Sequence, residues 1–217
     1  MVLIIISNGR SMLFSFTYFS ISIINSLPNF ICEINDVPIH FIHIKSPNEN
    51  SKPIILTHGW PWTFWDWHKV IKPLTDPESF GGGPEDSFDV IVPSLPGYGF
   101  SSPLQSSGIN FWETADMWVH LMRDVLGYDK FAAGGGDWGA LITAQLGHKY
   151  AKFIIGTYIH LMAPLDLFSG PLPDKMDYSQ DEEKYFDRNE AFFANESGYS
   201  AMQTTKPQTV AFGLNYY

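Results

Sequence analysis

Cysteine and basic residues are both scarce in this sequence, which has one cysteine, Cys32, and 13 lysines and arginines among 217 residues. A single cysteine cannot form an internal disulfide, and no histidine or second cysteine stands beside it at the spacing of a metal site. The 23 acidic residues give a formal net charge of -10, and no basic stripe is present that could bind phosphates. We therefore expect no nucleic-acid partner, and the 45% hydrophobic content predicts one globular domain.

The segment 1–27 has almost no charge, since Arg10 is its single charged residue. A signal peptide places positive charge before its apolar run, whereas Arg10 follows one, and Asn8, Gly9 and several serines interrupt any continuous span. These features favour an extra strand, or a start that does not belong to a complete protein, over a signal or membrane anchor. Membrane association stays an open alternative, so the expected location is cytoplasmic or membrane-associated, at the endoplasmic reticulum in a eukaryotic cell.

From Pro28 to Ala163, short apolar runs alternate with helix-like segments. This alternation is typical of an α/β core with a mainly parallel sheet and helices on both faces. Asn110 and Glu113 resemble a capping box at the start of one helix, and Asn35-Asp36 resembles the turn of a hairpin. We expect strands at 31–33, 38–45, 53–57, 88–92, 130–133 and 154–159, helices at 112–126 and 138–150, and a solvated acidic helix within 174–190.

The most informative segment is Gly134–Gly139 (GGGDWG), which lies between an expected strand and an expected helix. A nucleophile elbow is a turn so tight that small residues must flank the nucleophile, and Gly135 and Gly139 occupy the two positions where a side chain would collide. A glycine-rich loop that binds phosphate is the alternative, but Asp137 would place a carboxylate where the anion should lie. We therefore interpret Asp137 as a nucleophile.

An aspartate at this position restricts the reaction, because a carboxylate that attacks an alkyl carbon forms an ester that water can hydrolyse. Epoxides and haloalkanes are the two common electrophiles of this kind. Hydrolysis of the ester needs an oxyanion hole, which the backbone N–H groups of Trp138 and of Trp60, in the segment 58–61 (HGWP), can supply. Pro61 stiffens that turn, and we interpret His58 as holding the loop by a hydrogen bond rather than as a general base.

Three motifs carry a resemblance to a known family: His58-Gly59-Trp60-Pro61, the segment 93–101 (PSLPGYGFS) and the segment 135–139 (GGDWG). Their order and wording resemble epoxide hydrolases of the microsomal type, from about Pro28 to the C-terminus. The resemblance implies an α/β-hydrolase fold and an enzyme that opens epoxides of apolar compounds to diols through an ester on Asp137. It implies a small apolar epoxide and water as partners, and no metal or organic cofactor.

The last part of the chain is similar to the lid of this family. The segments 196–199 and 203–209 resemble the part of the lid that carries a ring-opening tyrosine. The resemblance assigns this role to Tyr199, which would donate a proton to the epoxide oxygen. The expected domains are therefore the apolar segment 1–27, a hydrolase core over 28–163 and a partial lid over 164–217.

The catalytic acid and histidine of this fold follow the nucleophile along the chain, and the histidine comes after the last strand. The sequence stops within the lid, so we expect an incomplete form truncated before both residues, with an open sheet edge. His160 and Asp166 are conceivable substitutes, but we interpret each as an ordinary residue at a strand end or lid entry. A haloalkane dehalogenase and a non-catalytic hydrolase-like fragment are the alternative functions.

Overall fold

The computed structural model describes residues 2–3, 22–161 and 174–209. The chain divides into two compact units, Met1–Leu165 and Asp166–Tyr217, and each is described by itself. The boundary predicted between the core and the lid, after residue 163, lies outside the described residues. The sequence-based domain limits therefore stay predictions.

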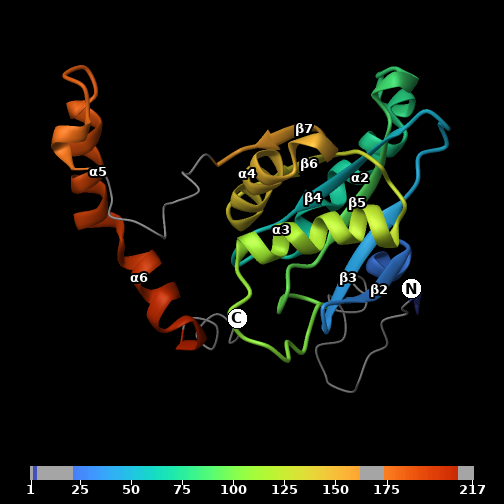
Figure 1. The fold of residues 1–217 in the computed structure, drawn as a ribbon, viewed down its shortest axis with the longest axis horizontal. Helices are drawn as coiled ribbons and strands as arrows, with labels where there is room; N and C mark the ends of the chain where they lie inside the picture. The colour runs from blue at the N-terminus through green and yellow to red at the C-terminus, as the bar shows by residue number, and fades with distance from the viewer. Residues whose placement is uncertain (1, 4–21, 162–173, 210–217) are drawn as a thin grey trace. The chain divides into compact units, whose positions relative to one another are not determined.

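The first unit is built on a seven-stranded sheet with the order β1-β2-β3-β5-β4-β6-β7 (Figure 1). The strands β5, β4, β6 and β7 run parallel to one another, whereas β1, β2, β3 and β5 are joined by antiparallel pairing. Among the described strands, β7 pairs with β6 alone and so forms one edge. The bounds are β1 Val2–Leu3, β2 Asn29–Ile34, β3 Val37–Ile44, β4 Lys52–Thr57, β5 Phe88–Pro93, β6 Phe131–Gly135 and β7 Ile154–Ile159.

The hairpin predicted near the start of the chain is confirmed as β2 and β3. Asn35 and Asp36 connect the two strands with φ angles of 52° and 62°. Asparagine and aspartate tolerate this left-handed region better than other non-glycine residues, and a two-residue turn with two positive φ angles matches the twist of the strands. The turn residues therefore explain the tight connection.

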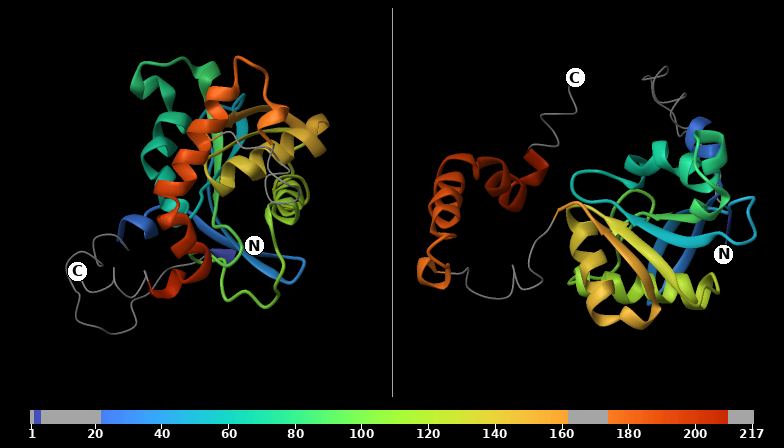
Figure 2. Two further views of the ribbon diagram at one scale, coloured as in Figure 1. Left: turned by 90° about the vertical axis from the view of Figure 1, so that its left-hand side faces the viewer. Right: turned by 90° about the horizontal axis from the view of Figure 1, so that it is seen from above.

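Helices cover both faces of the sheet, as predicted (Figure 2). Successive residues of a strand point to opposite faces. Ile55 and Ile91 accordingly join the apolar cluster that includes residues of α3 (Phe111–His120) and α4 (Trp138–Lys149), whereas Ile54 and Val90 join the cluster that includes Ile71 of α2 (His68–Thr75). The central strands are apolar on both sides because both faces are buried.

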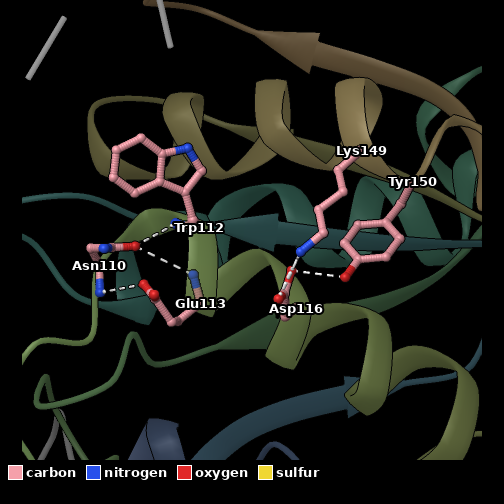
Figure 3. A network of polar contacts seen from close by, with 6 residues as sticks. All are labelled: Asn110, Trp112, Glu113, Asp116, Lys149 and Tyr150. Atoms are coloured by element: carbon pink, nitrogen blue, oxygen red, sulfur yellow. Dashed lines mark hydrogen bonds and ion pairs between the residues drawn. The ribbon is translucent and has the colours of Figure 1, made fainter. Parts of the chain in front are cut away.

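The start of α3 is fixed by the predicted capping box (Figure 3). Asn110 Oδ1 accepts hydrogen bonds from the N–H groups of Trp112 (2.8 Å) and Glu113 (3.3 Å). The Glu113 carboxylate accepts one in return from the Asn110 N–H (3.3 Å). These bonds satisfy N–H groups at the first turn that have no partner within the helix.

Farther along α3, Asp116 joins this helix to the end of α4 (Figure 3). Its carboxylate accepts hydrogen bonds from Lys149 Nζ at 2.7 Å and from the Tyr150 hydroxyl at 2.8 Å. The contact raises the pKa of Lys149, with the hydrogen bond to Asp116 as the largest cause. The two helices are thus connected by polar contacts as well as by their shared apolar cluster.

The second unit contains the helices α5 (Glu183–Glu196) and α6 (Gly198–Thr205), which follow a 3-10 turn at Lys175–Asp177. None of the residues in these helices is buried, in agreement with the solvated acidic helix that the sequence predicts. Phe192 and Met202 are more than half exposed, at 58% and 52%. The described part of this unit therefore has no buried core of its own.

Membrane association is the remaining question that the sequence left open. Within residues 2–3, 22–161 and 174–209, no helix has the length and apolarity that crossing a membrane would require. Most of the apolar segment 1–27, namely residues 4–21, lies outside the described residues.

Candidate active site

Asp137 lies at a sharp bend between β6 and α4. Its φ of 54° and ψ of -126° form a conformation that a non-glycine residue adopts only under strain. A Cβ on Gly135 would collide with the backbone carbonyl of Gly139, and a Cβ on Gly139 would collide with the carbonyl oxygen of Thr57. The bend has the geometry of a nucleophile elbow, which presents its side chain at the start of a helix.

Two more glycines are explained by contacts that the sequence does not reveal. A Cβ on Gly59 would overlap the Cβ and the carboxylate of Asp137. A Cβ on Gly136 would overlap the imidazole ring of His160. A side chain at either position would displace a side chain from another segment, so turn chemistry alone does not account for these glycines.

The Asp137 carboxylate is held by backbone donors from two separate loops. Its Oδ1 accepts hydrogen bonds from the N–H of Trp60 at 2.8 Å and from the N–H of Trp138 at 2.7 Å. Bonds to an ionised carboxylate are stronger than neutral ones, and the first turn of α4 also favours a negative charge through the helix dipole. The structure thus brings together the three residues to which the sequence assigns nucleophile and oxyanion roles. Among the described residues, none donates a hydrogen bond to Oδ2.

His58 braces the loop that carries the Trp60 N–H. Its Nε2 accepts a hydrogen bond from the Leu95 N–H at 3.1 Å, and its Nδ1 lies 3.0 Å from the Gly59 carbonyl oxygen. Because Nε2 accepts, the neutral ring carries its proton on Nδ1. Burial lowers the pKa of His58, and the Gly59 carbonyl and the Asp137 charge oppose part of this shift. Both ring nitrogens are engaged, which leaves no nitrogen of His58 for general-base chemistry.

Tyr98, from the second sequence motif, packs beside the same loop. Its ring centroid lies 5.4 Å from that of His58 and 5.8 Å from that of Trp60, with edge-on orientations. Burial, followed by the negative charge of Asp137, raises the pKa of Tyr98. The phenol is therefore held in its neutral form close to the candidate nucleophile.

The segment 93–101, which carries Tyr98, is held by hydrogen bonds to the buried His40. The sequence analysis did not single out this histidine. His40 Nδ1 lies 2.9 Å from Ser94 Oγ, and its Nε2 lies 3.0 Å from Asn29 Oδ1. The His40 N–H donates to Ser101 Oγ, which in turn donates to the Ser94 carbonyl oxygen. Burial lowers the pKa of His40 to about 4. The available signal was a histidine within a strand that is apolar apart from His40 and His43.

Two cavities flank the elbow. One has a volume of about 270 Å³ and is lined by residues that include Leu95, Tyr98, Ile109, Thr114, Trp138 and Ile142. The other has a volume of about 340 Å³ and is lined by residues that include His58, Gly59, Asp66, Trp67, Gly136 and His160. The first wall is mostly apolar, whereas the second contains several titratable groups. Burial raises the pKa of Asp66 in the second cavity.

Three other residues were singled out in the sequence: Tyr199, Asp166 and His160. Tyr199 lies on α6 in the second unit and is 59% exposed, so its role stays a prediction. Asp166 lies outside the described residues. The His160 ring contacts Trp67, with centroids 6.3 Å apart, and within residues 22–161 no hydrogen bond joins it to Asp137. In the described parts of the chain, no group of three or more histidine, cysteine or acidic residues could hold a metal ion.

Comparisons with known proteins define the class. A family model for the alpha/beta hydrolase fold matches residues 52–203, a range that includes the elbow and the donor loop. The chain therefore belongs to the α/β-hydrolase family. A second model, for the epoxide hydrolase N terminus, matches residues 17–67. This match begins upstream of Pro28, where the sequence motifs had led us to expect the resemblance to start.

Individual relatives confirm the resemblance to epoxide hydrolases. A relative from Stigmatella aurantiaca is 44% identical over 191 residues, which cover 88% of this chain and 42% of the relative. Epoxide hydrolase 1 of Oryctolagus cuniculus is 36% identical over 210 residues, which cover 90% of this chain and 46% of that protein.

Solved structures agree with these relatives. The structure is similar to that of an epoxide hydrolase from Aspergillus niger, with a TM-score of 0.68 and 29% identity over 93% of this chain and 51% of that one. It is also similar to the juvenile hormone epoxide hydrolase of Bombyx mori, with a TM-score of 0.66 and 30% identity over 91% of this chain and 44% of that one. The chain spans about half the length of these proteins or less.

Proposed function

We propose that this chain carries the nucleophilic part of an epoxide hydrolase, in which Asp137 opens the epoxide of an apolar compound and forms an alkyl ester. The observation that carries the proposal is the asymmetric environment of the Asp137 carboxylate. Oδ1 is fixed by the Trp60 and Trp138 N–H groups at 2.8 and 2.7 Å, and Oδ2 accepts no hydrogen bond from a described residue. Oδ2 is therefore the oxygen that attacks.

In the first step, Oδ2 forms a bond to one epoxide carbon while the bond between that carbon and the epoxide oxygen breaks. The epoxide oxygen leaves as an alkoxide and takes up a proton. We assign proton donation to Tyr199, as the resemblance to the family's lid implies. General-acid help of this kind contributes roughly 10²- to 10⁴-fold.

In the second step, water attacks the Cγ of Asp137 and the Cγ–Oδ2 bond breaks. Oδ2 leaves in the diol with one proton of the water, and the other proton restores the phenol that gave up its proton in the first step. Oδ1 is then the carbonyl oxygen of the ester, and the negative charge of the tetrahedral intermediate develops on it. The Trp60 and Trp138 N–H groups already lie within hydrogen-bond distance of this oxygen. Donors fixed before the charge develops are worth roughly 3 kcal/mol each in comparable oxyanion holes.

Activation of this water requires a base, and the described histidines near the elbow are poorly suited to the task. Both nitrogens of His58 are engaged by the Gly59 carbonyl and the Leu95 N–H. His160 has no hydrogen bond to Asp137 among the described residues. We propose that the described residues, which offer no base for this water, carry the reaction as far as the ester and do not turn over by themselves.

The proposal extends to partners and location. The substrates would be a small apolar epoxide and water, and no cofactor takes part in either step. Association with the membrane of the endoplasmic reticulum follows from the microsomal resemblance alone. Fractionation of eukaryotic cells that express a tagged chain tests it, and recovery in the cytosolic fraction would contradict it.

Intact-mass measurement after incubation with styrene oxide tests the reaction. The unmodified chain should gain one adduct with the mass of the epoxide, and Asp137→Asn should gain none. Asp124→Asn is the matched control, because Asp124 has a side chain that is 65% exposed and lies on another element. An adduct that persists in Asp137→Asn contradicts the assignment of the nucleophile.

Two parallel assays separate the alternatives. Faster labelling by a bromoalkane than by the epoxide, with release of bromide, would favour a haloalkane dehalogenase. Absence of any adduct with either reagent would favour a non-catalytic hydrolase-like chain. Repeated diol formation by this chain alone would contradict the proposed stop at the ester.

A further inference from the structure

We propose that Trp118 is a positioning residue for the oxyanion hole. Its indole N–H donates a hydrogen bond to Thr57, and this bond keeps the Trp60 N–H directed at Asp137 Oδ1. The inference rests on the proposed function, because it concerns how the ester on Asp137 is hydrolysed. Trp118 acts through Thr57 and not on the substrate.

The bond between Trp118 and Thr57 joins two residues that are closed off from water. Trp118 is 0% exposed and Thr57 is 1% exposed, and the indole Nε1 lies 3.0 Å from Thr57 Oγ1. A buried tryptophan needs an acceptor for its indole N–H, and an acceptor anywhere in the core would meet that need. Here the acceptor is the last residue of β4. The bond therefore fixes the point at which the chain leaves the sheet.

Thr57 is also the residue at which the two donor segments meet. In the parallel pairing of β4 with β6, Thr57 is the partner of Gly135. Its carbonyl oxygen lies where a Cβ on Gly139 would collide with it. Thr57 thus lies against the chain on both sides of the elbow, and the loop 58–61 continues directly from it.

The loop 58–61 is attached to the core at two places. His58 Nε2 accepts from the Leu95 N–H at 3.1 Å, which holds the loop toward the segment after β5. Thr57 holds the start of the loop toward α3 through Trp118. A donor in a catalytic site has to be held to within about 0.5 Å. A rotation of the backbone at Thr57 would displace the Trp60 N–H, which lies three residues farther along.

The helix that carries Trp118 is itself firmly held. Trp118 belongs to the larger apolar cluster, together with the fully buried Leu121 and Met122. Figure 3 shows two polar contacts of the same helix, the capping box at its start and the bonds from Asp116 to the end of α4. The indole N–H is therefore fixed before any substrate binds.

The test measures how fast hydroxylamine cleaves the Asp137 ester that styrene oxide forms. The hydroxylamine nitrogen attacks Cγ, negative charge develops on Oδ1, and the Cγ–Oδ2 bond breaks. The nitrogen loses a proton, Oδ2 leaves in the diol with a proton, and a hydroxamate remains at residue 137. Hydroxylamine needs no catalytic base, and intact mass follows the ester and the hydroxamate. The same ester in the urea-unfolded chain gives the rate without an oxyanion hole.

Two substitutions remove the bond from opposite sides. Thr57→Val removes the hydroxyl and keeps the shape, and Trp118→Phe removes the N–H and keeps an aromatic ring. Each should slow cleavage about tenfold, because loss of a whole oxyanion donor costs roughly 10²- to 10³-fold and the Trp60 N–H is displaced rather than lost. Formation of the ester should change far less, since no charge develops on Oδ1 in that step. If one variant does not fold, the other tests the same bond.

Two further variants show whether the hydrogen bond itself is responsible. Thr57→Ser keeps the hydroxyl and should cleave within about twofold of the unmodified rate. The double variant of Thr57→Val and Trp118→Phe should be no slower than the slower single variant, because both changes remove one bond. Slowing in the double variant equal to the product of the two single effects would overturn the inference.

Thr75→Val is the matched control. Thr75 is also buried, at 6% exposure, and its hydroxyl donates to the Lys72 carbonyl oxygen at 3.3 Å at the end of α2. The substitution should lower the stability to urea and leave the cleavage rate unchanged. Equal slowing by Thr75→Val and Thr57→Val, or an unchanged rate in both Thr57→Val and Trp118→Phe, would overturn the role of Trp118.

A spectroscopic measurement separates this inference from the proposed reaction. In the chain labelled with ¹⁵N-tryptophan, Thr57→Val should move the Trp60 amide proton resonance upfield, because a longer bond to the carboxylate deshields it less. The Trp138 amide proton should not move. This shift without any alkylation of the unmodified chain would support the positioning role and contradict the reaction. Normal alkylation without the shift would overturn the positioning role and leave the reaction standing.

Discussion

The two units of this chain differ in how their side chains are buried, and the difference separates the parts of the proposed mechanism. In the first unit, two apolar clusters fill both faces of the sheet, and Asp137 lies among glycines that have no room for a side chain. In the second unit, α5 and α6 bury no residue. The proposed nucleophile is therefore positioned by a core, whereas the proposed proton donor, Tyr199, is not positioned by one.

The hydrogen bonds of the two units show the same contrast. In the first unit, the Trp118 indole N–H donates to Thr57 Oγ1 at 3.0 Å across 61 positions of the chain, and His40 meets Ser94 across 54. In the second unit, Thr204 and Thr205 donate to carbonyl oxygens four residues earlier. Long-range contacts fix a site in three dimensions, while local contacts stabilise only the helix that contains them.

The largest predicted difference in stability is between alanine substitutions at two glycines, each near the start of a helix. Gly139→Ala should lower the free energy of unfolding by at least about 4 kcal/mol, because its Cβ would collide with the backbone carbonyl oxygen of Thr57. Gly198→Ala should change it by less than about 1 kcal/mol, since no atom lies within 4 Å of the added Cβ. Urea unfolding followed by far-ultraviolet circular dichroism, which reports the helices of both units, measures both changes. Equal losses of stability in the two variants would contradict the prediction.

The second-largest predicted effect is a decrease in the stability of the first unit at acidic pH, caused by protonation of His40 in the unfolded chain. Its pKa is about 4 in the folded chain, against an ordinary value of 6.5. Between pH 6.5 and pH 4 the unfolded chain takes up a proton that the folded chain does not, so stability falls as the pH falls. The loss should reach about 3 kcal/mol near pH 4 and should not grow further below it. Urea unfolding at a series of pH values between 7 and 4 checks it.

His40→Gln is the control for this dependence on pH. Glutamine keeps polar atoms near Ser94 and Asn29 but does not titrate, so the variant should lose most of the slope between pH 6.5 and 4. A smaller slope should persist, because burial also lowers the pKa of His43 and of His58. Parallel stability curves for the variant and the unmodified chain would contradict the prediction.

The smallest effect should distinguish two exposed aspartates that pair with lysines. Asp116→Asn should cost about 1 kcal/mol, because Asp116 accepts from both Lys149 and the Tyr150 hydroxyl and joins two helices. Asp187→Asn, which removes an exposed pair with Lys175 in the second unit, should cause no measurable change. Thermal unfolding of the two variants in parallel measures both changes in stability. A larger decrease for Asp187→Asn than for Asp116→Asn would contradict the prediction.

Much of the first unit could be predicted because its signals are local. The capping box at Asn110 and Glu113 and the hairpin turn at Asn35-Asp36 depend on residues close in sequence, and both are confirmed. The strand predicted at 130–133 was too short, since β6 continues to Gly135. Gly134 and Gly135 have little intrinsic preference for a strand, and parallel pairing with Leu56 and Thr57 overrides it.

The sequence by itself determined the elements, the glycine-flanked aspartate and the family, because hydrophobic periodicity, turn residues and short motifs are properties of neighbouring positions. Only the tertiary structure decided that Trp60 and Trp138 both donate to one oxygen of Asp137, that His58 is occupied by the Leu95 N–H, and that an apolar cavity lies beside the elbow. Apart from the bond from the neighbouring Trp138, each of these contacts joins segments far apart along the chain. Their distances depend on how the strands pair and the helices pack, and no local pattern specifies that.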